Sequence, residues 1–371
     1  MKAAKILIIG GGIGGLTSAI ALCQRGFDVD VIERDPDWSV YGVGIIQQSN
    51  VVRAVAALGI LDDYVDAGFG FDHVDVFLPD GRHAAKVPAL KLVAGYPANL
   101  GIGRRALHTV LGQRAQAAGA RIRLGLVANA LHDDGAGVDV TFSDTSSGRY
   151  DLVIGADGLY STTRRMIFPE AAAPAFTGQS VWRHNFERPE SVTSLCAYDG
   201  PIGIGLVPLS KSLMYMYVTT PEPGNPRHPH DQLASLMRQR LAGAPPQIAR
   251  LAEQITDNDE VVYKPLEWLF LEGAWHKGRV ALLGDAVHAT TPHLGQGAGM
   301  AIEDSLVLAE ELARADTPEQ AFQAYRDRRF ERCSFIVKSS LALCEGQLGI
   351  GPRLDPAKMT HEMFEIIAQP I

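Results

Sequence analysis

The chain has 371 residues, 46% of them hydrophobic, so it can build a large core, and we expect two subdomains. Its formal net charge of −8 at pH 7 argues against nucleic acid or an anionic membrane as a partner, and no run approaches the ~18 apolar residues of a membrane-spanning helix. Its four cysteines lack CxxC or metal-site spacing, which is typical of reduced thiols in a cytoplasmic protein, so we expect no metal ion.

The first predicted unit is a strand, a glycine-rich turn, a helix and a second strand. These segments are residues 5–9, 10–15, 16–25 and 27–32. Their order and spacing are those of a Rossmann dinucleotide-binding unit. Gly10 would allow the tight turn, Gly12 would let the backbone approach a pyrophosphate, and Gly15 would let the helix pack on the strand. Glu33 would accept hydrogen bonds from ribose hydroxyls, and these residues alone leave NAD and FAD open.

Two later segments each have two interpretations. Residues 43–48 form an apolar, glycine-flanked loop before a helix that Ser49 or Asn50 can cap. This loop fits either contact with a flat ring or a plain approach to the helix. The next helix begins at Arg104 and Arg105, which oppose the helix dipole. The pair therefore predicts either a bound anion or two solvated side chains.

A buried strand precedes the second polar motif. Strands are predicted at residues 72–79, 121–126, 138–142 and 151–155. The last of them leads into Asp157 and Gly158, followed by a helix that Ser161 can cap. This order places Asp157 at the carboxyl edge of a sheet, where ligands bind in α/β folds.

The middle of the chain is predicted to be an antiparallel sheet. Its strands are residues 179–186, 194–198, 202–208, 212–219 and 261–268. Such an insertion into an α/β protein usually forms a second layer, here the wall of a substrate cavity. Tyr215 and Tyr217 share one face by alternation, and both cavity lining and ordinary packing remain open for them.

The chain then returns to the first domain. A strand at residues 279–283 is followed by a loop with Gly295, Gly297 and Gly299 that leads into a helix. Free backbone N–H groups and the positive helix end would stabilise negative charge on a reduced ring. The chain is predicted to stay helical to about residue 347, with a solvated basic face formed by Arg326, Arg328, Arg329 and Arg332.

Three separated motifs resemble those of the single-component (class A) FAD-dependent aromatic hydroxylases, the family of para-hydroxybenzoate, salicylate and flavin-dependent urate hydroxylases. They are Gly10-x-Gly12-x-x-Gly15 with Glu33, Asp157-Gly158-x-x-Ser161-x-x-Arg164, and Gly284-Asp285-Ala286-x-His288 with Pro292 and Gly295-x-Gly297. The resemblance covers residues 5–332 and implies FAD rather than NAD as the bound dinucleotide.

The fold implied is α/β, a Rossmann-like FAD-binding domain with an inserted antiparallel-sheet substrate domain and C-terminal helices. The first domain would span residues 1–175, with minor substrate-side insertions at about 71–100. The substrate domain would span residues 176–268, and residues 269–371 would return to the FAD domain and form the C-terminal helices. The resemblance leaves a monomer or a homodimer open.

The resemblance also implies which residues hold FAD. They are Gly10, Gly12, Ile13, Gly14, Gly15, Glu33, Arg34, Arg104, Val127, Asp157, Asp285, Pro292, Gly295, Gly297 and Ala298. Glu33 would hold the adenosine ribose, Arg34 would lie near the adenine, and Val127 would meet the adenine through its backbone. Asp157 would help to bind both the pyrophosphate and the nicotinamide co-substrate. Asp285 would bind the ribityl chain.

The reaction implied is hydroxylation of a small aromatic or heteroaromatic substrate. NADH or NADPH would reduce FAD, O₂ would add to the reduced ring as a C4a-hydroperoxide, and the distal oxygen would pass to the substrate. Residues 295–298 would face the pyrimidine end of the flavin, and Pro292 would pack near the hydroperoxide. There are two alternatives. One is the same chemistry on a larger polycyclic natural product or antibiotic, and the other is a non-hydroxylating flavoprotein oxidoreductase.

The substrate-activating base differs among relatives. Some have a histidine in the segment aligned with residues 44–48, where this chain has none. In the urate enzymes an acid follows the loop proline, where this chain has His293. Their sheet tyrosine matches Tyr215, and their nearby arginine falls on Gly203. We expect His293 and Tyr215 to contact the substrate, with His293 as the base. The alternative is that His293 is a packing or solvent-facing residue.

Overall fold

A six-stranded sheet forms one end of the molecule. The computed structural model describes residues 4–40, 42–198, 200, 202–352 and 354–371. Strand order is β18-β19-β12-β1-β2-β8, parallel except for β18. The strands are β1 (Lys5–Ile9), β2 (Asp28–Glu33), β8 (Arg121–Leu124), β12 (Leu152–Gly155), β18 (His276–Lys277) and β19 (Val280–Leu282). The central strands β1 and β12 are almost wholly buried, as expected for a parallel sheet covered on both faces.

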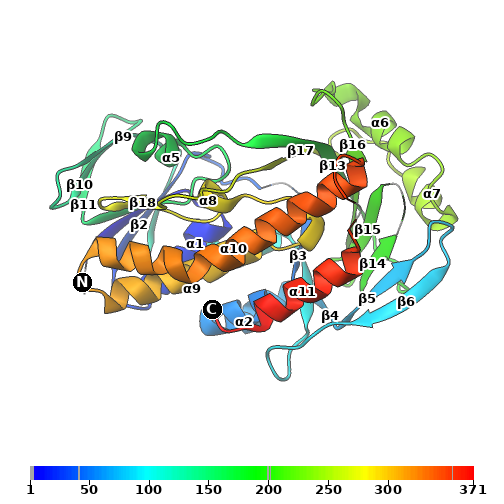
Figure 1. Cartoon of the computed structure of the whole chain (residues 1–371), viewed down its shortest axis with the longest axis horizontal. Helices are drawn as coiled ribbons and strands as arrows, with labels where there is room; N and C mark the ends of the chain where they lie inside the picture. The colour runs from blue at the N-terminus through cyan, green and yellow to red at the C-terminus, as the bar shows by residue number, and fades with distance from the viewer. Residues whose placement is uncertain (1–3, 41, 199, 201, 353) are drawn as a thin grey trace.

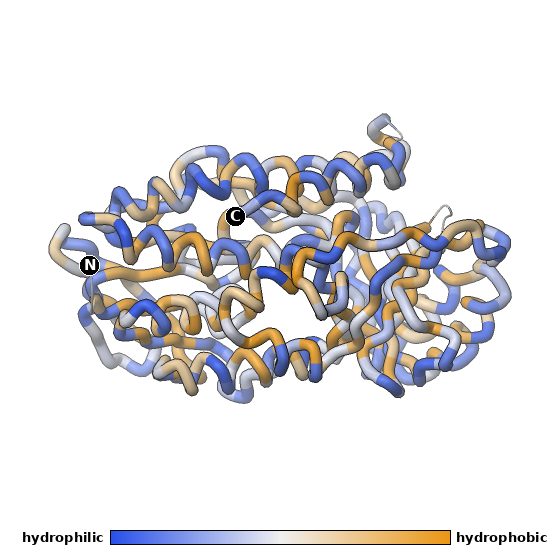
Figure 2. The backbone as a smooth tube through the Cα atoms, turned by 90° about the horizontal axis from the view of Figure 1, so that it is seen from below, coloured by the Kyte–Doolittle hydropathy of each residue, from blue (hydrophilic) through white to orange (hydrophobic). Residues whose placement is uncertain are grey.

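Long helices pack on this sheet and connect it to the rest of the molecule. They are α1 (Ile13–Cys23), α4 (Arg104–Ala117), α9 (Gly297–Arg314), α10 (Pro318–Leu348) and α11 (Pro356–Ala368). The last of them, α11, packs on α10 and on α2 (Ser49–Ala57) instead of on the sheet. Helix α1 packs between α4 and α9, and α10 packs on α9. Figure 1 shows α10 running from the parallel sheet to the second large sheet, where it contacts that sheet's long strand. Hydrophobic and hydrophilic residues alternate along the outer helix α10, which packs on the core with one side, whereas α1 and α9 are buried on all sides over most of their length (Figure 2).

The second large sheet has seven strands in the order β17-β13-β16-β15-β14-β5-β6. They are β5 (His73–Phe77), β6 (His83–Pro88), β13 (Ala175–Glu187), β14 (Leu195–Tyr198), β15 (Gly203–Pro208), β16 (Leu213–Pro221) and β17 (Val262–Trp268). The expected antiparallel sheet is present. Strand β5 pairs in parallel with β14, so residues from the 71–100 insertion extend the sheet. The sequence did not indicate this pairing. One face is covered by α6 (Leu233–Arg240) and α7 (Pro246–Ala252), and the short η1 (His230–Gln232) precedes α6.

Smaller elements complete the fold. The remaining strands are β3 (Gly44–Gln47), β4 (Gly68–Phe71), β7 (Asn99–Gly103), β9 (Ala128–Asp133), β10 (Val138–Phe142) and β11 (Ser147–Tyr150). The remaining helices are α2 (Ser49–Ala57), α3 (Leu61–Asp66), α5 (Thr162–Ile167), α8 (Asp285–His288) and η2 (Pro292–Leu294). Among the described residues, no helix combines the length and apolar character needed to cross a membrane.

Two local predictions before α2 are wrong. The expected loop at residues 43–48 contains strand β3, which pairs with β7. Helix α2 is preceded by Gln48 and has no side-chain cap, because the Asn50 amide is directed to Gln296 and Glu303 instead. A tertiary contact has therefore replaced the local capping bond.

Candidate active site

The glycine-rich turn lies at the carboxyl end of β1, beside the end of β12. A Cβ atom at Gly10 would lie 2.4 Å from the Ala156 carbonyl oxygen, and one at Gly15 would lie 1.9 Å from the Gly10 carbonyl oxygen. Gly10 also has φ of +111°, which a side chain would strain. Gly12 is exposed, and nothing lies within 4 Å of a Cβ placed there. The turn itself requires Gly10 and Gly15, whereas Gly12 keeps open the space at the start of α1.

Gly14 brings the first and third motifs together. A Cβ atom at Gly14 would lie 2.8 Å from Leu283 Cδ2 and 3.3 Å from Ala301 Cβ. Leu283 follows β19, and Ala301 belongs to α9. The start of α1, with the partly exposed Ile13, therefore packs against the segment that carries Asp285.

Glu33 lies at the end of β2 and is fixed beside the glycine turn. Its carboxylate accepts hydrogen bonds from the backbone N–H of Gly11 at 2.8 Å and of Asp35 at 3.0 Å. Trp38 Nε1 and His108 Nε2 both donate to the Gly11 carbonyl oxygen, at 3.0 and 2.9 Å. The sequence analysis missed these two side chains, since neither belongs to a motif. Arg34, beside Glu33, is exposed.

Asp157 holds its own motif together. Its carboxylate accepts hydrogen bonds from the Ser161 hydroxyl at 2.5 Å and from Thr163 N and Oγ1 at 2.9 and 3.0 Å. Ser161 caps α5 as predicted, accepting from Arg164 N at 2.8 Å. The buried Arg164 donates to the Ala286 carbonyl oxygen at 2.9 Å. The second and third motifs are therefore joined directly.

The other predicted FAD residues lie in two places. Val127 is exposed beyond β8; its N–H donates to Ser143 Oγ at 3.1 Å and its carbonyl accepts from Ser143 N at 2.9 Å. Only the second lone pair of that carbonyl remains for an adenine amine.

Helix α9 begins at Gly297, so the expected glycine loop is shorter and Ala298 lies in the first turn. Pro292 is exposed in η2, and Gly295 follows with φ of +66°.

Four side chains from different elements are related through the charge of Arg104, and we call them the inner cluster: Asp285, Arg104, Arg183 and Tyr215. Asp285 is exposed to solvent, yet the protein around it raises the pKa of its carboxyl, and His288 and Arg104 oppose that shift. Burial lowers the pKa of Arg183 to about 10, the charge of Arg104 adds to the shift, and Tyr215 opposes it. Burial raises the pKa of the Tyr215 hydroxyl, opposed by both arginines. The charge of Arg104 therefore acts both on Asp285, at the α8 side of the site, and on Arg183 and Tyr215 of the second sheet.

Tyr215 is buried against β3. A Cβ atom at Gly44 would lie 2.6 Å from Tyr215 Cδ1, so β3 packs directly on the tyrosine ring. Tyr215 pairs with Asn185 on β13, and Tyr217 pairs with Arg183. The two tyrosines share one face of the sheet, as the alternation predicted, and that face is opposite the core under α6 and α7.

His293 makes hydrogen bonds through both ring nitrogens. Nδ1 lies 2.9 Å from Thr291 Oγ1 and Nε2 lies 3.1 Å from Gln347 Oε1. Since an amide oxygen only accepts, we assign the proton to Nε2, and Nδ1 accepts from the Thr291 hydroxyl. Burial lowers the pKa of His293 to about 4. The ring is neutral at pH 7, its one acceptor atom is occupied, and both features weaken it as a base.

Gln347 is a third residue, after Trp38 and His108, that no sequence motif marks. It lies on α10 and also accepts from Gln179 Nε2 at 3.0 Å. A Cβ atom at Gly203 would lie 3.9 Å from Gln347 Nε2. His293, Gln347 and Gly203 therefore lie together, although they are far apart in the sequence.

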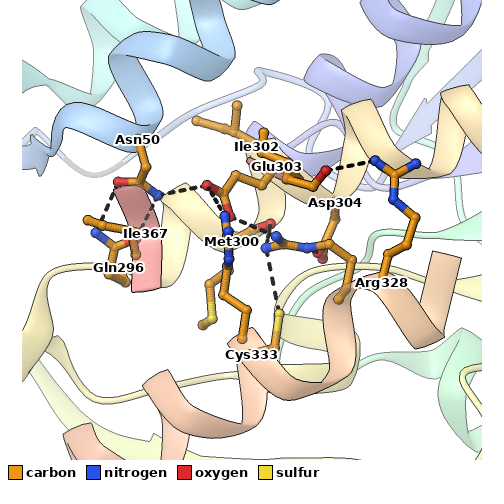
Figure 3. A network of polar contacts seen from close by, with 12 residues as sticks. Asn50, Gln296, Met300, Ile302, Glu303, Asp304, Arg328, Cys333 and Ile367 are labelled. Atoms are coloured by element: carbon orange, nitrogen blue, oxygen red, sulfur yellow. Dashed lines mark hydrogen bonds and ion pairs between the residues drawn. The ribbon is translucent and has the colours of Figure 1, made fainter. Parts of the chain in front are cut away.

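The prediction of a solvated basic face on α10 is wrong for Arg329 and Arg332. Arg329 is fully buried and pairs with Glu303 at 2.7 Å and with Asp304 at 2.8 Å. Arg332 is 9% exposed and pairs with Glu303 at 3.1 Å. Both acids lie on α9, so the network joins the two long helices inside the protein (Figure 3).

This buried ionic network supports the segments expected at the flavin. Glu303 accepts from Asn50 Nδ2 at 3.1 Å, and Asn50 also bonds Gln296, the residue before α9 (Figure 3). Asp304 accepts from Gly284 N at 3.2 Å and bonds His288 Nε2 at 2.6 Å. The network therefore fixes the chain on both sides of η2, at Gly284 and at Gln296.

The same region contains ligand atoms of His288, Asp304 and Cys333 within 4.8 Å of one another. Arg329 donates to Asp304 Oδ1 at 2.8 Å and to Cys333 Sγ at 3.6 Å. A metal ion bound there would face the Arg329 guanidinium, so we assign none to it.

We expect stability to fall at alkaline pH because of His288. Burial alone would lower its pKa, but Cys333 and Asp304 outweigh burial and hold the pKa well above its usual range. The stabilisation is complete below the unfolded pKa of about 6.5 and is lost as pH rises through the folded pKa. The free energy of unfolding should then fall above about pH 6.5, by at most ~1.4 kcal/mol per unit for this proton. Urea unfolding should show this slope for the wild type and a shallower one for His288→Gln; equal slopes would contradict the assignment.

Comparison with known proteins decides the family. A family model described as an FAD binding domain matches residues 3–340. The chain belongs to the FAD-dependent aromatic hydroxylases. Named relatives are monooxygenases and hydroxylases, and the chain is an FAD-dependent monooxygenase of this hydroxylase family.

Three relatives illustrate the similarity. The 2-heptyl-3-hydroxy-4(1H)-quinolone synthase of Pseudomonas aeruginosa is 33% identical over 357 residues, which cover 93% of this hydroxylase and 89% of that protein. The aurachin C monooxygenase/isomerase of Stigmatella aurantiaca is 31% identical over 353 residues, with coverage of 93% and 89%. The crystal structure of Klebsiella pneumoniae HpxO complexed with FAD and uric acid has a TM-score of 0.83 at 25% identity, with coverage of 98% and 92%.

The residues of this hydroxylase fit FAD. The open space at Gly12 lies beside the N-terminus of α1, where backbone N–H groups can meet a pyrophosphate. The carboxylate of Glu33 is held at the end of the neighbouring strand. At the other end, solvent reaches Asp285 near Arg104. The carboxylate, the open helix N-terminus and the exposed acid are groups of the kind that suit a ribose, a pyrophosphate and a ribityl chain, so the residues present fit FAD.

Proposed function

We propose that this hydroxylase uses NADH or NADPH and O₂ to hydroxylate a small heteroaromatic substrate. The observation that carries the proposal is the joining of the three motifs: Arg164 of the second donates to the Ala286 carbonyl oxygen of the third, and Gly14 of the first packs on Leu283 and Ala301 beside it. Two relatives support the substrate class, since the quinolone and the uric acid that their names contain are heteroaromatic compounds. We further propose that the FAD-binding residues implied by the motifs act as stated above.

Bound FAD supplies the electron transfer from the nicotinamide and the activation of O₂. The chain supplies orientation and a controlled environment. A tyrosine hydroxyl is protonated at neutral pH, and burial raises the pKa of Tyr215 further, so this hydroxyl can donate a hydrogen bond to a substrate oxygen. The packing of β3 on its ring fixes the position of that hydroxyl.

We propose that His293 contacts the substrate and expect only a small effect of His293→Ala on hydroxylation. A base that accepts the substrate's proton would contribute roughly 10²–10⁴-fold. Burial holds the pKa of His293 at about 4, and Thr291 occupies its acceptor nitrogen, so we expect a loss below about tenfold. The measurement is product formed per NAD(P)H oxidised across pH 6–9. A hundredfold loss would restore the base role that the sequence suggested.

The function itself is tested by NADH and NADPH oxidation with purified, FAD-loaded protein. A panel of hydroxypyridines, hydroxybenzoates, quinolones and purines is added singly, and product and hydrogen peroxide are both scored. A compound that speeds oxidation and gains one oxygen supports the proposal and identifies the substrate class. Oxidation without any oxygenated product, including with larger polycyclic compounds, would favour a non-hydroxylating oxidoreductase.

A further inference from the structure

A chain of side-chain amides leads from the buried ionic network to the loop before α9. The carboxylate of Glu303 accepts from Asn50 Nδ2 at 3.1 Å, and Asn50 Nδ2 also donates to Gln296 Oε1 at 2.9 Å (Figure 3). Gln296 Nε2 donates back to Asn50 Oδ1 at 3.1 Å and donates as well to Gln48 Oε1. Asn50, Gln296 and Glu303 are each at most 1% exposed, whereas Gln48, at the end of the chain, is only half-buried.

The charge on Glu303 sets the direction of every hydrogen bond in this chain. Glu303 faces two guanidinium groups, at 2.7 and 3.1 Å, and as a carboxylate it only accepts hydrogen bonds. Asn50 must therefore turn its amide nitrogen to Glu303, which leaves the Asn50 oxygen to accept from Gln296. Gln296 presents its nitrogen in turn, so Gln48 receives that bond through its oxygen. Reversing any one of these amides would set two donors or two acceptors against each other.

The amide nitrogen of Gln48 is the free end of this chain. Within the described part of the chain, no residue accepts a hydrogen bond from Gln48 Nε2. A Cβ atom at Gly295 would lie 3.3 Å from this nitrogen, which therefore lies beside the loop expected at the flavin. Gln48 also directly follows β3, the strand that packs on the ring of Tyr215. The free N–H groups thus occur where the segment expected at the flavin meets the strand that holds the proposed substrate contact.

The orientation of the Gln48 amide is fixed before any ligand binds. A partly exposed glutamine ordinarily turns its amide freely in water, but the oxygen of Gln48 is held by the buried Gln296. A donor that is already oriented loses less conformational entropy when a ligand accepts a hydrogen bond from it. Gln48 is therefore prepared to recognise an acceptor atom.

We propose that Gln48 donates a hydrogen bond to an uncharged acceptor atom of the substrate, either a ring nitrogen or a carbonyl oxygen. The inference rests on the proposed function and specifies its substrate class, a heteroaromatic compound that carries such an acceptor. A carbocyclic ring of the same shape would displace water from the N–H groups of Gln48 and offer no partner in return, which is unfavourable. Gln48 therefore selects heteroaromatic over carbocyclic rings.

The test measures binding to oxidised, FAD-loaded protein by the change in flavin absorbance, without turnover. There are two matched pairs of probes. One is 6-hydroxyquinoline with 2-naphthol, which lacks only the ring nitrogen, and the other is chromone with 4H-chromene, which lacks only the carbonyl oxygen.

Two variants remove the donor in different ways. Gln48→Met keeps the length of the side chain without the amide, and Gln48→Glu keeps an oxygen for Gln296 but offers no N–H group. The matched control is Gln116→Met, because Gln116 is exposed on α4 and lies outside the three motifs.

Wild type and the Gln116→Met control should bind at least one acceptor-bearing probe roughly 3–10-fold more tightly than its partner, the range of one hydrogen bond. Both Gln48 variants should lose this preference. The pair that shows it in the wild type identifies the acceptor as a ring nitrogen or a carbonyl oxygen. A wild type without preference in either pair would overturn the proposal. So would a preference that survives in Gln48→Met, and a changed spectrum of the substrate-free flavin in that variant would then assign the donor to the flavin.

The two proposals fail separately. A lost preference in Gln48→Met, with no oxygenated product from any compound in the wild type, would retain the Gln48 contact and refute the hydroxylase proposal. Oxygenated product from the wild type, with the same preference in wild type and Gln48→Met, would do the reverse.

Discussion

Replacing Arg329 by Met should lower the free energy of unfolding by about 3–5 kcal/mol, because it leaves Glu303 and Asp304 buried without their main cation. Both acids are fully buried, and Arg332 and His288 can compensate only part of their charge. The change keeps a side chain of similar length, so the loss reports the charge rather than a cavity. Urea unfolding of the apoprotein and of the FAD-loaded protein measures it.

The matched control is Arg314→Met. Arg314 is 69% exposed on α9, and its ion pair with Glu311 is long, at 3.9 Å. Exposed pairs contribute about 0–1 kcal/mol, so this variant should unfold almost as the wild type does. If Arg329→Met also stays within about 1 kcal/mol of the wild type, the buried network does not hold α9 and α10 together as described.

Gly12→Val should abolish tight FAD binding without unfolding the apoprotein. A Cβ atom at Gly12 meets nothing within 4 Å, and its φ of −79° suits any residue. The added side chain would occupy the space of the pyrophosphate and cost roughly 3 kcal/mol, which corresponds to about 100-fold weaker binding. FAD titration of the apoprotein by fluorescence measures the affinity, and circular dichroism verifies the fold.

Gly273→Val is the control for this change, because a Cβ at that position also meets nothing within 4 Å and Gly273 lies outside all three motifs. It should bind FAD as the wild type does. Gly15→Ala makes the opposite comparison: its Cβ would lie 1.9 Å from the Gly10 carbonyl oxygen, so it should destabilise the apoprotein itself. FAD binding by Gly12→Val at wild-type affinity would place the pyrophosphate elsewhere.

The sequence predicted the features that depend on local order. The strand, glycine turn and helix at residues 5–25 follow from an apolar run, three spaced glycines and a helical composition, and the structure has them. The Ser161 cap was predictable for the same reason, because cap and helix are adjacent in the chain. The alternation of Tyr215 and Tyr217 placed both on one face of a strand.

Features that depend on distant partners were not predictable. In the sequence, nothing distinguishes Arg329 from the neighbouring arginines that point to solvent. Glu303 reaches it only because α9 packs on α10. Gln347 reaches His293 across 54 residues, and no pattern marks it. The pairing of β5 with β14 depends on how the inserted segment crosses the molecule. The pKa of His293 likewise depends on burial that the sequence does not contain.

The most direct test of the hydroxylase assignment is the origin of the oxygen in the product. The FAD-loaded protein is incubated with NADH or NADPH, the compound that most stimulates oxidation, and ¹⁸O₂ in ordinary water, and the product is analysed by mass spectrometry. We predict one ¹⁸O atom per product molecule and none from water. A product whose new oxygen comes from water, or oxidation that yields only hydrogen peroxide, would contradict the assignment.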